Sequence, residues 1–143
     1  MARIFLAEDN VTFRQLLKGL LESQAGWEIC GETGDGLEAV DKVIELKPDV
    51  VVVDFAMSRL NGLQVAARIS SACPGLPIIL HTVHVFPAMI AEAKKVGICE
   101  VVGKNETAER LLGIIERLVE KKPPSIASLL KNSPSPHFSP DVN

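Results

Sequence analysis

The stretch Pro48-Asp49-Val50-Val51-Val52-Val53-Asp54-Phe55-Ala56-Met57-Ser58-Arg59-Leu60-Asn61-Gly62 carries the strongest structural signal in the chain. A proline opens it, four valines follow without polar alternation, and an aspartate stands where the valines end. An unalternating β-branched run predicts a strand buried on both faces, as in a parallel sheet covered by helices. Ligands of such sheets bind beyond the carboxyl ends of the strands, so Asp54 is a candidate site residue.

Strand and helix patterns alternate on both sides of this stretch. Apolar runs predict further strands at residues 3–7, 27–31 and 98–102, and another that begins at Ile78 and ends at His81-Thr82. Apolar residues at helical spacing predict five helices, which follow the strands one by one. Asn10 can cap the first helix, which should run to about Ser23. The fifth is the most amphipathic, with apolar positions at Leu111, Leu112, Ile114, Ile115, Leu118 and Val119.

Local signals mark several ends of these elements. Asp35, with Glu38 three residues later, resembles a capping box for the second helix. Asn61-Gly62 predicts a turn before the third helix. Pro87 suits the first position of the fourth helix, and Gly97 stands where the C-terminal cap of that helix should fall.

Five strand–helix units in strict alternation predict an α/β fold, a doubly wound five-stranded parallel sheet with helices on both faces. Right-handed crossovers leave few topologies, and one common order is the flavodoxin-like 2-1-3-4-5. In that order Glu8, Asp9 and Asp54 meet at one edge of the sheet. The next two strands bring Thr82 and Lys104 to the same edge.

Composition narrows the class of protein. The 143 residues suit one folded domain, 47% of them are hydrophobic, and the formal net charge is −3. This charge gives no reason to expect direct nucleic-acid binding. No apolar run is long enough to span a membrane, and the N-terminus does not resemble a signal peptide. Three widely spaced cysteines suggest reduced thiols and a cytoplasmic location: Cys30, Cys73 and Cys99.

The last part of the chain differs in composition from the rest. Five of the nine prolines lie between Pro123 and Asn143, mixed with serines. We therefore expect a folded domain over residues 1–121 and a flexible tail or linker over residues 122–143.

The polar groups at the strand ends suggest a chemistry. Crowded carboxylates are stabilised by a cation, and oxygen-only ligands suit Mg²⁺. Lys104 and the Thr82 hydroxyl could contact a phosphoryl group, toward which Asp54 could act as the nucleophile. Taken singly, each residue has an ordinary alternative: Glu8 and Asp9 as helix N-terminal acids, and Lys104 as a surface lysine.

The joint pattern resembles the receiver domain of bacterial two-component response regulators over residues 2–120. The resemblance implies that Asp54 accepts a phosphoryl group from a histidine kinase or phosphotransfer protein. It implies a Mg²⁺ site of side chains and one backbone carbonyl: Glu8, Asp9, Asp54 and Ala56. It also implies that Thr82 and Lys104 contact the phosphoryl group and form part of the switch. The 2-1-3-4-5 order is shared by this family, so the resemblance supports it as well.

Three positions depart from the pattern of that family. Ser58 replaces the usual proline in the loop after the phosphoacceptor. Val83 replaces a small residue after the threonine, which should narrow the access of phosphodonors. Val101 replaces the usual aromatic residue of the fifth strand, so a threonine–aromatic switch is not expected.

Two other functions are compatible with parts of this pattern. One is a receiver-like protein-binding module that acts independently of phosphorylation. The other is a haloacid-dehalogenase-like phosphatase, which needs a second aspartate where this chain has Ala56. We therefore expect a signalling domain that catalyses only its own phosphotransfer and dephosphorylation. Its output should be a partner protein or a C-terminal output domain outside this chain, such as a DNA-binding one.

Overall fold

The computed structural model describes residues 1–121, which form a five-stranded sheet flanked by five helices. The strands are β1 (Ala2–Ala7), β2 (Trp27–Thr33), β3 (Val50–Val53), β4 (Ile78–Thr82) and β5 (Glu100–Gly103). The helices are α1 (Val11–Glu22), α2 (Gly36–Leu46), α3 (Gly62–Ala72), α4 (Pro87–Lys95) and α5 (Ala108–Lys121). The predicted tail over residues 122–143 lies outside the described residues.

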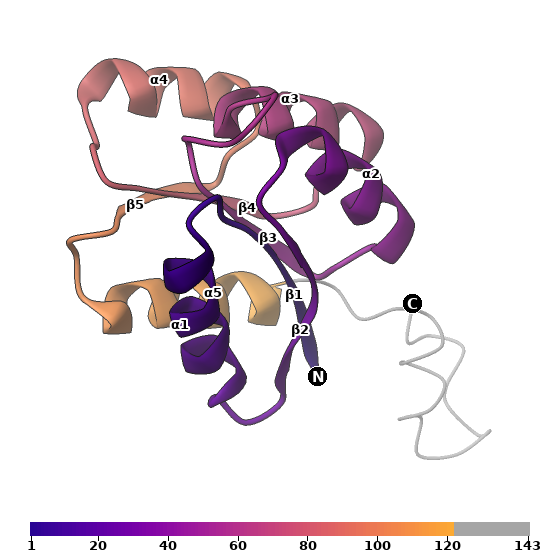
Figure 1. Cartoon of the computed structure of the whole chain (residues 1–143), viewed down its shortest axis with the longest axis vertical. Helices are drawn as coiled ribbons and strands as arrows, with labels where there is room; N and C mark the ends of the chain where they lie inside the picture. The colour runs from indigo at the N-terminus through magenta and orange to yellow at the C-terminus, as the bar shows by residue number, and fades with distance from the viewer. Residues whose placement is uncertain (122–143) are drawn as a thin grey trace, which may run out of the picture.

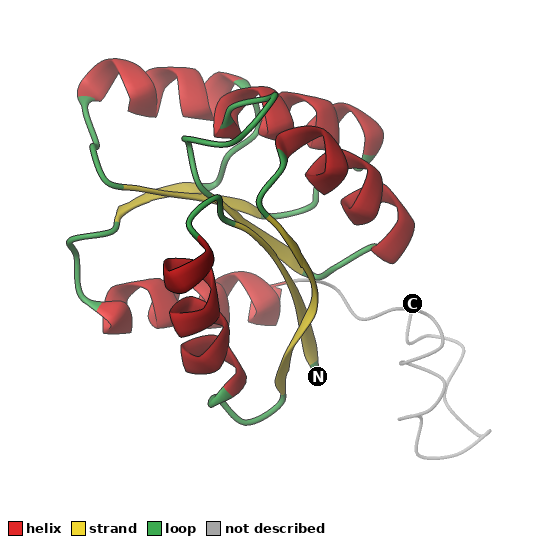
Figure 2. Cartoon of the chain, viewed as in Figure 1, coloured by secondary structure: helices red, strands yellow, loops and turns green. Residues whose placement is uncertain are grey.

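All neighbouring strands pair in parallel, in the order β2-β1-β3-β4-β5, which confirms the predicted fold class. Helices α1 and α5 cover one face of the sheet, and α2, α3 and α4 cover the other (Figure 1). Figure 2 shows the strands as a single layer between these two groups of helices. Because every crossover returns the chain to the same end of the sheet, the loops after the strands gather at one edge.

Each face of the sheet has its own apolar core. Beneath α2, α3 and α4 the core includes Phe5, Val51 and Leu80; beneath α1 and α5 it includes Leu6 and Val52. The four valines of β3 are all buried, as their unalternating pattern predicted. No helix within the described residues 1–121 is long and apolar enough to cross a membrane.

Several predicted helix ends are confirmed. The Asn10 side chain accepts a hydrogen bond from the Phe13 amide at 2.8 Å and caps α1. Pro87 opens α4, and Gly97, just past the end of that helix, has a φ of +94°. That backbone conformation favours glycine, which explains why the helix ends there.

Other local predictions were wrong. The Asp35 side chain makes no capping hydrogen bond, because its carboxylate pairs with Arg59, and the Glu38 carboxylate accepts from the Thr33 hydroxyl instead. Asn61-Gly62 does not form a separate turn before the third helix. Asn61 caps α3 in a capping box with Gln64, and Gly62 is the first residue of the helix.

Two predicted strands have different limits. Strand β2 continues two residues past 31, to Thr33. Strand β5 begins at Glu100 rather than at 98, because the Ile98 amide still donates to the carbonyl of Ala93 in α4. The chain thus completes the end of α4 before it joins the sheet.

Candidate functional site

Strand pairing brings the predicted site residues to one edge of the sheet. Ala7 pairs with Val53, and the amide of Asp54 donates to the Ala7 carbonyl at 2.9 Å. Glu8 and Asp54 therefore leave adjacent strands at the same level. The Lys104 amide donates to the Thr82 carbonyl at 2.7 Å, so β4 and β5 end at the same edge.

Two buried carboxylates share one ammonium group at this edge. Glu8 is 2% exposed and Asp54 is 6% exposed. The Lys104 Nζ lies 2.7 Å from Glu8 Oε1 and 3.3 Å from Asp54 Oδ2. A cation between two buried carboxylates offsets the repulsion between their charges. It also offsets part of the free energy lost when the carboxylates are removed from water. Lys104 is thus not a surface lysine, and Glu8 is not merely a helix N-terminal acid.

Burial raises the pKa of the Glu8 carboxyl above its ordinary value. Hydrogen bonds from Lys104 and from the Asn10 amide oppose this rise, and the nearby Asp54 charge adds to it. The Asn10 amide donates to Glu8 Oε2 at 3.0 Å, so both oxygens of the Glu8 carboxylate have partners. Both contacts favour the charged form, which is the form that can bind a cation.

Asp9 directly follows Glu8 in the chain, Ala56 lies two residues after Asp54, and both residues are exposed. The Ser58 hydroxyl donates to Asp9 Oδ1 at 3.4 Å, which ties the loop after β3 to the loop after β1. No group of three His, Cys, Asp or Glu side chains gathers closely enough to hold a metal ion within residues 1–121. The oxygen donors nevertheless fit Mg²⁺ in kind, because two carboxylates already hold one cation and a third, Asp9, is adjacent to Glu8 in the chain.

The loop after Asp54 is fixed at several points, although it lacks the usual proline. The Ser58 carbonyl accepts from the Gly36 amide at 2.9 Å. Arg59 has a φ of +68°, unusual for a residue with a side chain, and its guanidinium pairs with Asp35 at the start of α2. These contacts hold the segment that carries the Ala56 carbonyl.

Gly62 closes that loop tightly. A Cβ at this position would collide with the backbone carbonyl of Asp54 and lie 2.9 Å from a methyl group of Leu80. The start of α3 can therefore approach the phosphoacceptor candidate only because residue 62 has no side chain.

A cavity of about 400 Å³ opens beside Asp54. Thr82, which is buried, and Val83, which is 57% exposed, line it together with Ala56 and Met89. Asp54 thus faces a space that solvent or a ligand can enter, with Val83 at its mouth. Val101 of β5 is only partly buried and packs against the apolar core.

Two contacts near the site were not predicted from the sequence. The Lys104 Nζ lies 4.6 Å from the centre of the Phe13 ring, a cation–π arrangement that supports the lysine from the α1 side. The Phe13 ring in turn lies 5.7 Å from the His81 ring. Phe13 looks like any core position of α1 in the sequence, so no local signal distinguishes it.

This sheet order is that of a flavodoxin-like α/β domain, and comparison with known proteins narrows the class. The model of the response regulator receiver domain family matches residues 4–116. The chain belongs to this family.

Two relatives illustrate the similarity in sequence. The chain is 32% identical over 116 residues to the chemotaxis protein CheY of Thermotoga maritima, a match that covers 81% of this chain and 96% of that protein. It is also 32% identical to protein-glutamate methylesterase/protein-glutamine glutaminase 5 of Myxococcus xanthus. That match covers 98% of this chain but only 41% of the relative, so the chain spans about two fifths of that protein.

Solved structures show the same fold. The response regulator domain of Thermotoga maritima CheB aligns with a TM-score of 0.79 at 30% identity and covers 86% of this chain and 99% of that one. A two-component response regulator of the LuxR family from Aurantimonas sp. SI85-9A1 aligns with a TM-score of 0.81 at 27% identity, covering 84% and 86%. The protein is therefore a receiver domain of the kind found in response regulators.

Proposed function

We propose that the domain accepts a phosphoryl group on Asp54 and changes its protein contacts as a result. One observation carries this proposal: Asp54 is buried, shares an ammonium group with Glu8, and faces a cavity lined by the Thr82 side of the sheet edge. A carboxylate held in this way is oriented toward an incoming group and can act as the nucleophile.

The proposed step is a simple displacement. A carboxylate oxygen of Asp54 forms a bond to the phosphorus of a phosphohistidine, and the phosphorus–nitrogen bond breaks. The histidine nitrogen leaves with the electron pair and takes a proton from solvent. Lys104 then turns from the Asp54 carboxylate to an oxygen of the phosphoryl group, and the Thr82 hydroxyl donates to another.

A Mg²⁺ ion is proposed to assist by neutralising charge on the carboxylates and on the phosphoryl oxygens. Glu8, Asp9, Asp54 and the carbonyl of Ala56 would hold it. The support is the donor chemistry and the Lys104 ammonium, which already occupies the place of a cation between two of the carboxylates.

Intact-mass measurement after treatment with acetyl phosphate and Mg²⁺ tests the phosphoacceptor. The parent protein should gain one phosphoryl group, and the Asp54→Asn variant should gain none. Asp49→Asn is the matched control, because Asp49 lies at the opposite end of β3 and accepts from the Arg3 amide. Equal labelling of the parent and Asp54→Asn would reject the assignment.

Titration calorimetry with Mg²⁺ tests the metal site separately. Asp9→Asn should bind Mg²⁺ clearly more weakly than the parent, because one of three carboxylates loses its charge. Asp49→Asn, which changes a carboxylate at the opposite end of β3, should bind as the parent does. Undiminished binding by Asp9→Asn would leave Asp9 without a role at the metal.

We further propose a histidine kinase or phosphotransfer protein as the donor and a cytoplasmic setting. The output would be a partner protein or an output domain beyond this chain. The support is the two relatives: one is a CheY of similar length, and the other is a longer methylesterase that this chain matches in part. Val101 offers no ring to repack, so the switch is proposed to act through the segment from Val83 to Phe86.

A further inference from the structure

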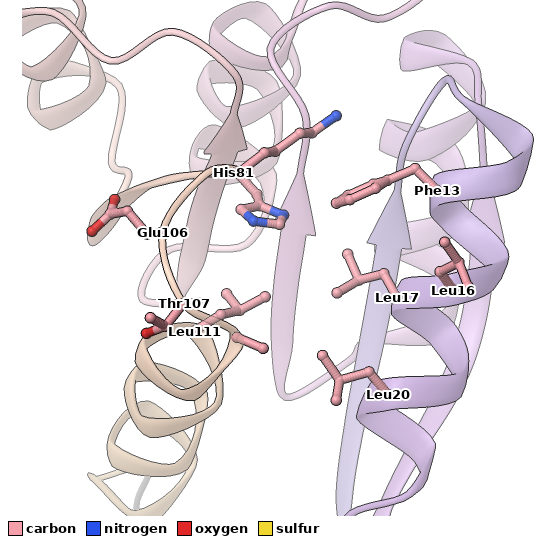
Figure 3. A pocket seen from close by; sticks show the side chains of 10 residues that line it. Phe13, Leu16, Leu17, Leu20, His81, Glu106, Thr107 and Leu111 are labelled. Carbon is pink, nitrogen blue, oxygen red and sulfur yellow. The ribbon is translucent and has the colours of Figure 1, made fainter.

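An apolar groove of about 170 Å³ lies between α1 and the start of α5, and we call it the α1–α5 groove. Four apolar side chains of α1 and one of α5 form its walls: Phe13, Leu16, Leu17, Leu20 and Leu111. Figure 3 shows these side chains on the two helices, with the His81 ring of β4 at one end of the space between them. Leu16 is 69% exposed, so the groove presents a large apolar side chain to water.

The polar residues of the lining leave no free charge in the groove. The Lys104 ammonium is held by Glu8 and Asp54, and the Glu106 carboxylate accepts from a backbone amide at 2.6 Å. Burial, and the nearby charge of Lys104, lower the pKa of His81 to about 4, so its ring is neutral at ordinary pH. The occupant that fits these walls is therefore apolar and uncharged.

A stretch of this composition follows α5 in the same chain. Residues 122–143 lie outside the described residues, and they include the uncharged run Ile126-Ala127-Ser128-Leu129-Leu130, in which three of five side chains are large and apolar. The other large apolar residues of this part of the chain, Phe138 and Val142, stand singly. The run is therefore the one segment there whose composition matches the α1–α5 groove.

The run is close enough along the chain to reach the groove. Ten residues of α5 separate Leu111 from Lys121, a distance of about 15 Å at 1.5 Å per residue. The eight residues from Lys121 to Leu129 can span up to about 26 Å. Pro123 and Pro124 do not favour continuation of a helix, so the chain can turn away from the axis of α5 directly after its end. A short tether also gives the run an effective concentration of about millimolar at the groove, which favours it over a separate molecule.

We propose that residues 126–130 dock in the α1–α5 groove of their own chain, with one leucine side chain of the run inserted beside Leu16. An apolar cavity of roughly 150 Å³ is large enough to take up benzene, so the groove has room for one leucine side chain. Covering Leu16 removes apolar surface from water, and this burial stabilises the docked run. The groove is separate from the cavity beside Asp54, and docking does not depend on the proposed phosphorylation.

The rate of trypsin cleavage after Lys131 tests the proposal on the full chain. Lys131 directly follows the run, so docking should slow cleavage there in proportion to the docked population. Leu16→Ser removes the exposed wall of the groove and leaves the core intact, so cleavage should be about fivefold to tenfold faster, as expected when about half of the burial of one leucine is lost. Val11→Ser changes another exposed apolar side chain of α1, one outside the groove lining, and should be cleaved at the parent rate. Equal rates in Leu16→Ser and the parent would overturn the proposal.

Amide chemical shifts of the groove provide an independent check from the side of the run. In ¹⁵N-labelled protein, replacing both Leu129 and Leu130 by serine should shift the amides of Leu17 and Leu111, because the groove loses its occupant. Phe138→Ser removes an apolar side chain outside the run and should leave both amides unchanged. Amides that do not respond to the double replacement would overturn the proposal. Shifts that change with protein concentration would also overturn it, because they would assign the groove to a second copy of the chain.

Discussion

Replacing His81 by leucine should remove a specific part of the pH dependence of stability. The pKa of His81 is lowered from 6.5 to about 4 in the folded protein, mainly by burial. As the pH falls, the unfolded chain therefore takes up a proton at this side chain before the folded protein does. This contribution to stability is complete above pH 6.5 and is lost progressively as the pH falls from 6.5 toward 4.

The size of the effect follows from the shift. A difference of one pKa unit corresponds to about 1.4 kcal/mol, so the full loss, reached below the folded pKa, is about 3 kcal/mol. Between about pH 7.5 and about pH 5 the expected loss is about 2 kcal/mol. Over this interval the free energy of unfolding of His81→Leu should fall by about 2 kcal/mol less than that of the parent. At the higher pH it should also be the more stable protein, by about 1 kcal/mol, because the unpaired Nδ1 is gone.

Urea unfolding of the parent and of His81→Leu at both pH values measures this difference. Burial raises the pKa of Glu8 as well, which acts in the opposite direction, but Glu8 is present in both proteins and its effect largely cancels. His84→Leu makes the same replacement in an exposed loop and serves as the control. The reasoning is refuted if the parent and His81→Leu lose the same free energy of unfolding between the two pH values.

Three further outcomes are expected. Lys104→Met should lower the free energy of unfolding in urea by about 3 kcal/mol without Mg²⁺, because two buried carboxylates lose their shared cation; an unchanged midpoint would contradict this. Gly62→Ala should cost about 2 kcal/mol in the same assay, because its Cβ meets a backbone carbonyl, whereas Gly113→Ala, with open space around it, should cost nothing. On addition of beryllofluoride, hydrogen exchange should change most over residues 83–86; a largest change over residues 101–104 would show that the fifth strand carries the switch.

The sequence was sufficient for the fold because its signals were repeated along the whole chain. The valine run of β3, the five alternating units and the strand order were all predicted and confirmed. Buried parallel strands need unalternating apolar residues, and this requirement leaves a pattern that can be recognised without any knowledge of contacts.

Local capping was harder to predict because distant residues compete for the same side chain. Asp35 was expected to cap α2, but Arg59, which lies 24 residues away in the sequence, takes its carboxylate. Asn61 was expected in a turn, and it caps α3 because Gln64 completes the capping box. The competition depends on which loops meet at the sheet edge, and this is a property of the tertiary structure.

The candidate site, too, was predicted from the sequence only in part. Residue types at strand ends predicted that Glu8, Asp54 and Lys104 would meet, and the structure brings them together. The unpaired nitrogen of His81 had no sequence signal. It depends on how β4 packs beneath α1, where the Phe13 ring lies 5.7 Å from the His81 ring, and no short stretch of sequence encodes this packing.

The most direct test of the central claim is to locate the phosphoryl group on the chain. After treatment with acetyl phosphate and Mg²⁺, hydroxylamine converts a carboxyl phosphate into a stable hydroxamate, which tandem mass spectrometry can place within the tryptic peptide of residues 43–59. We predict the hydroxamate at Asp54. A hydroxamate at Asp49 in the same peptide, or at Asp9 with none at Asp54, would contradict the account.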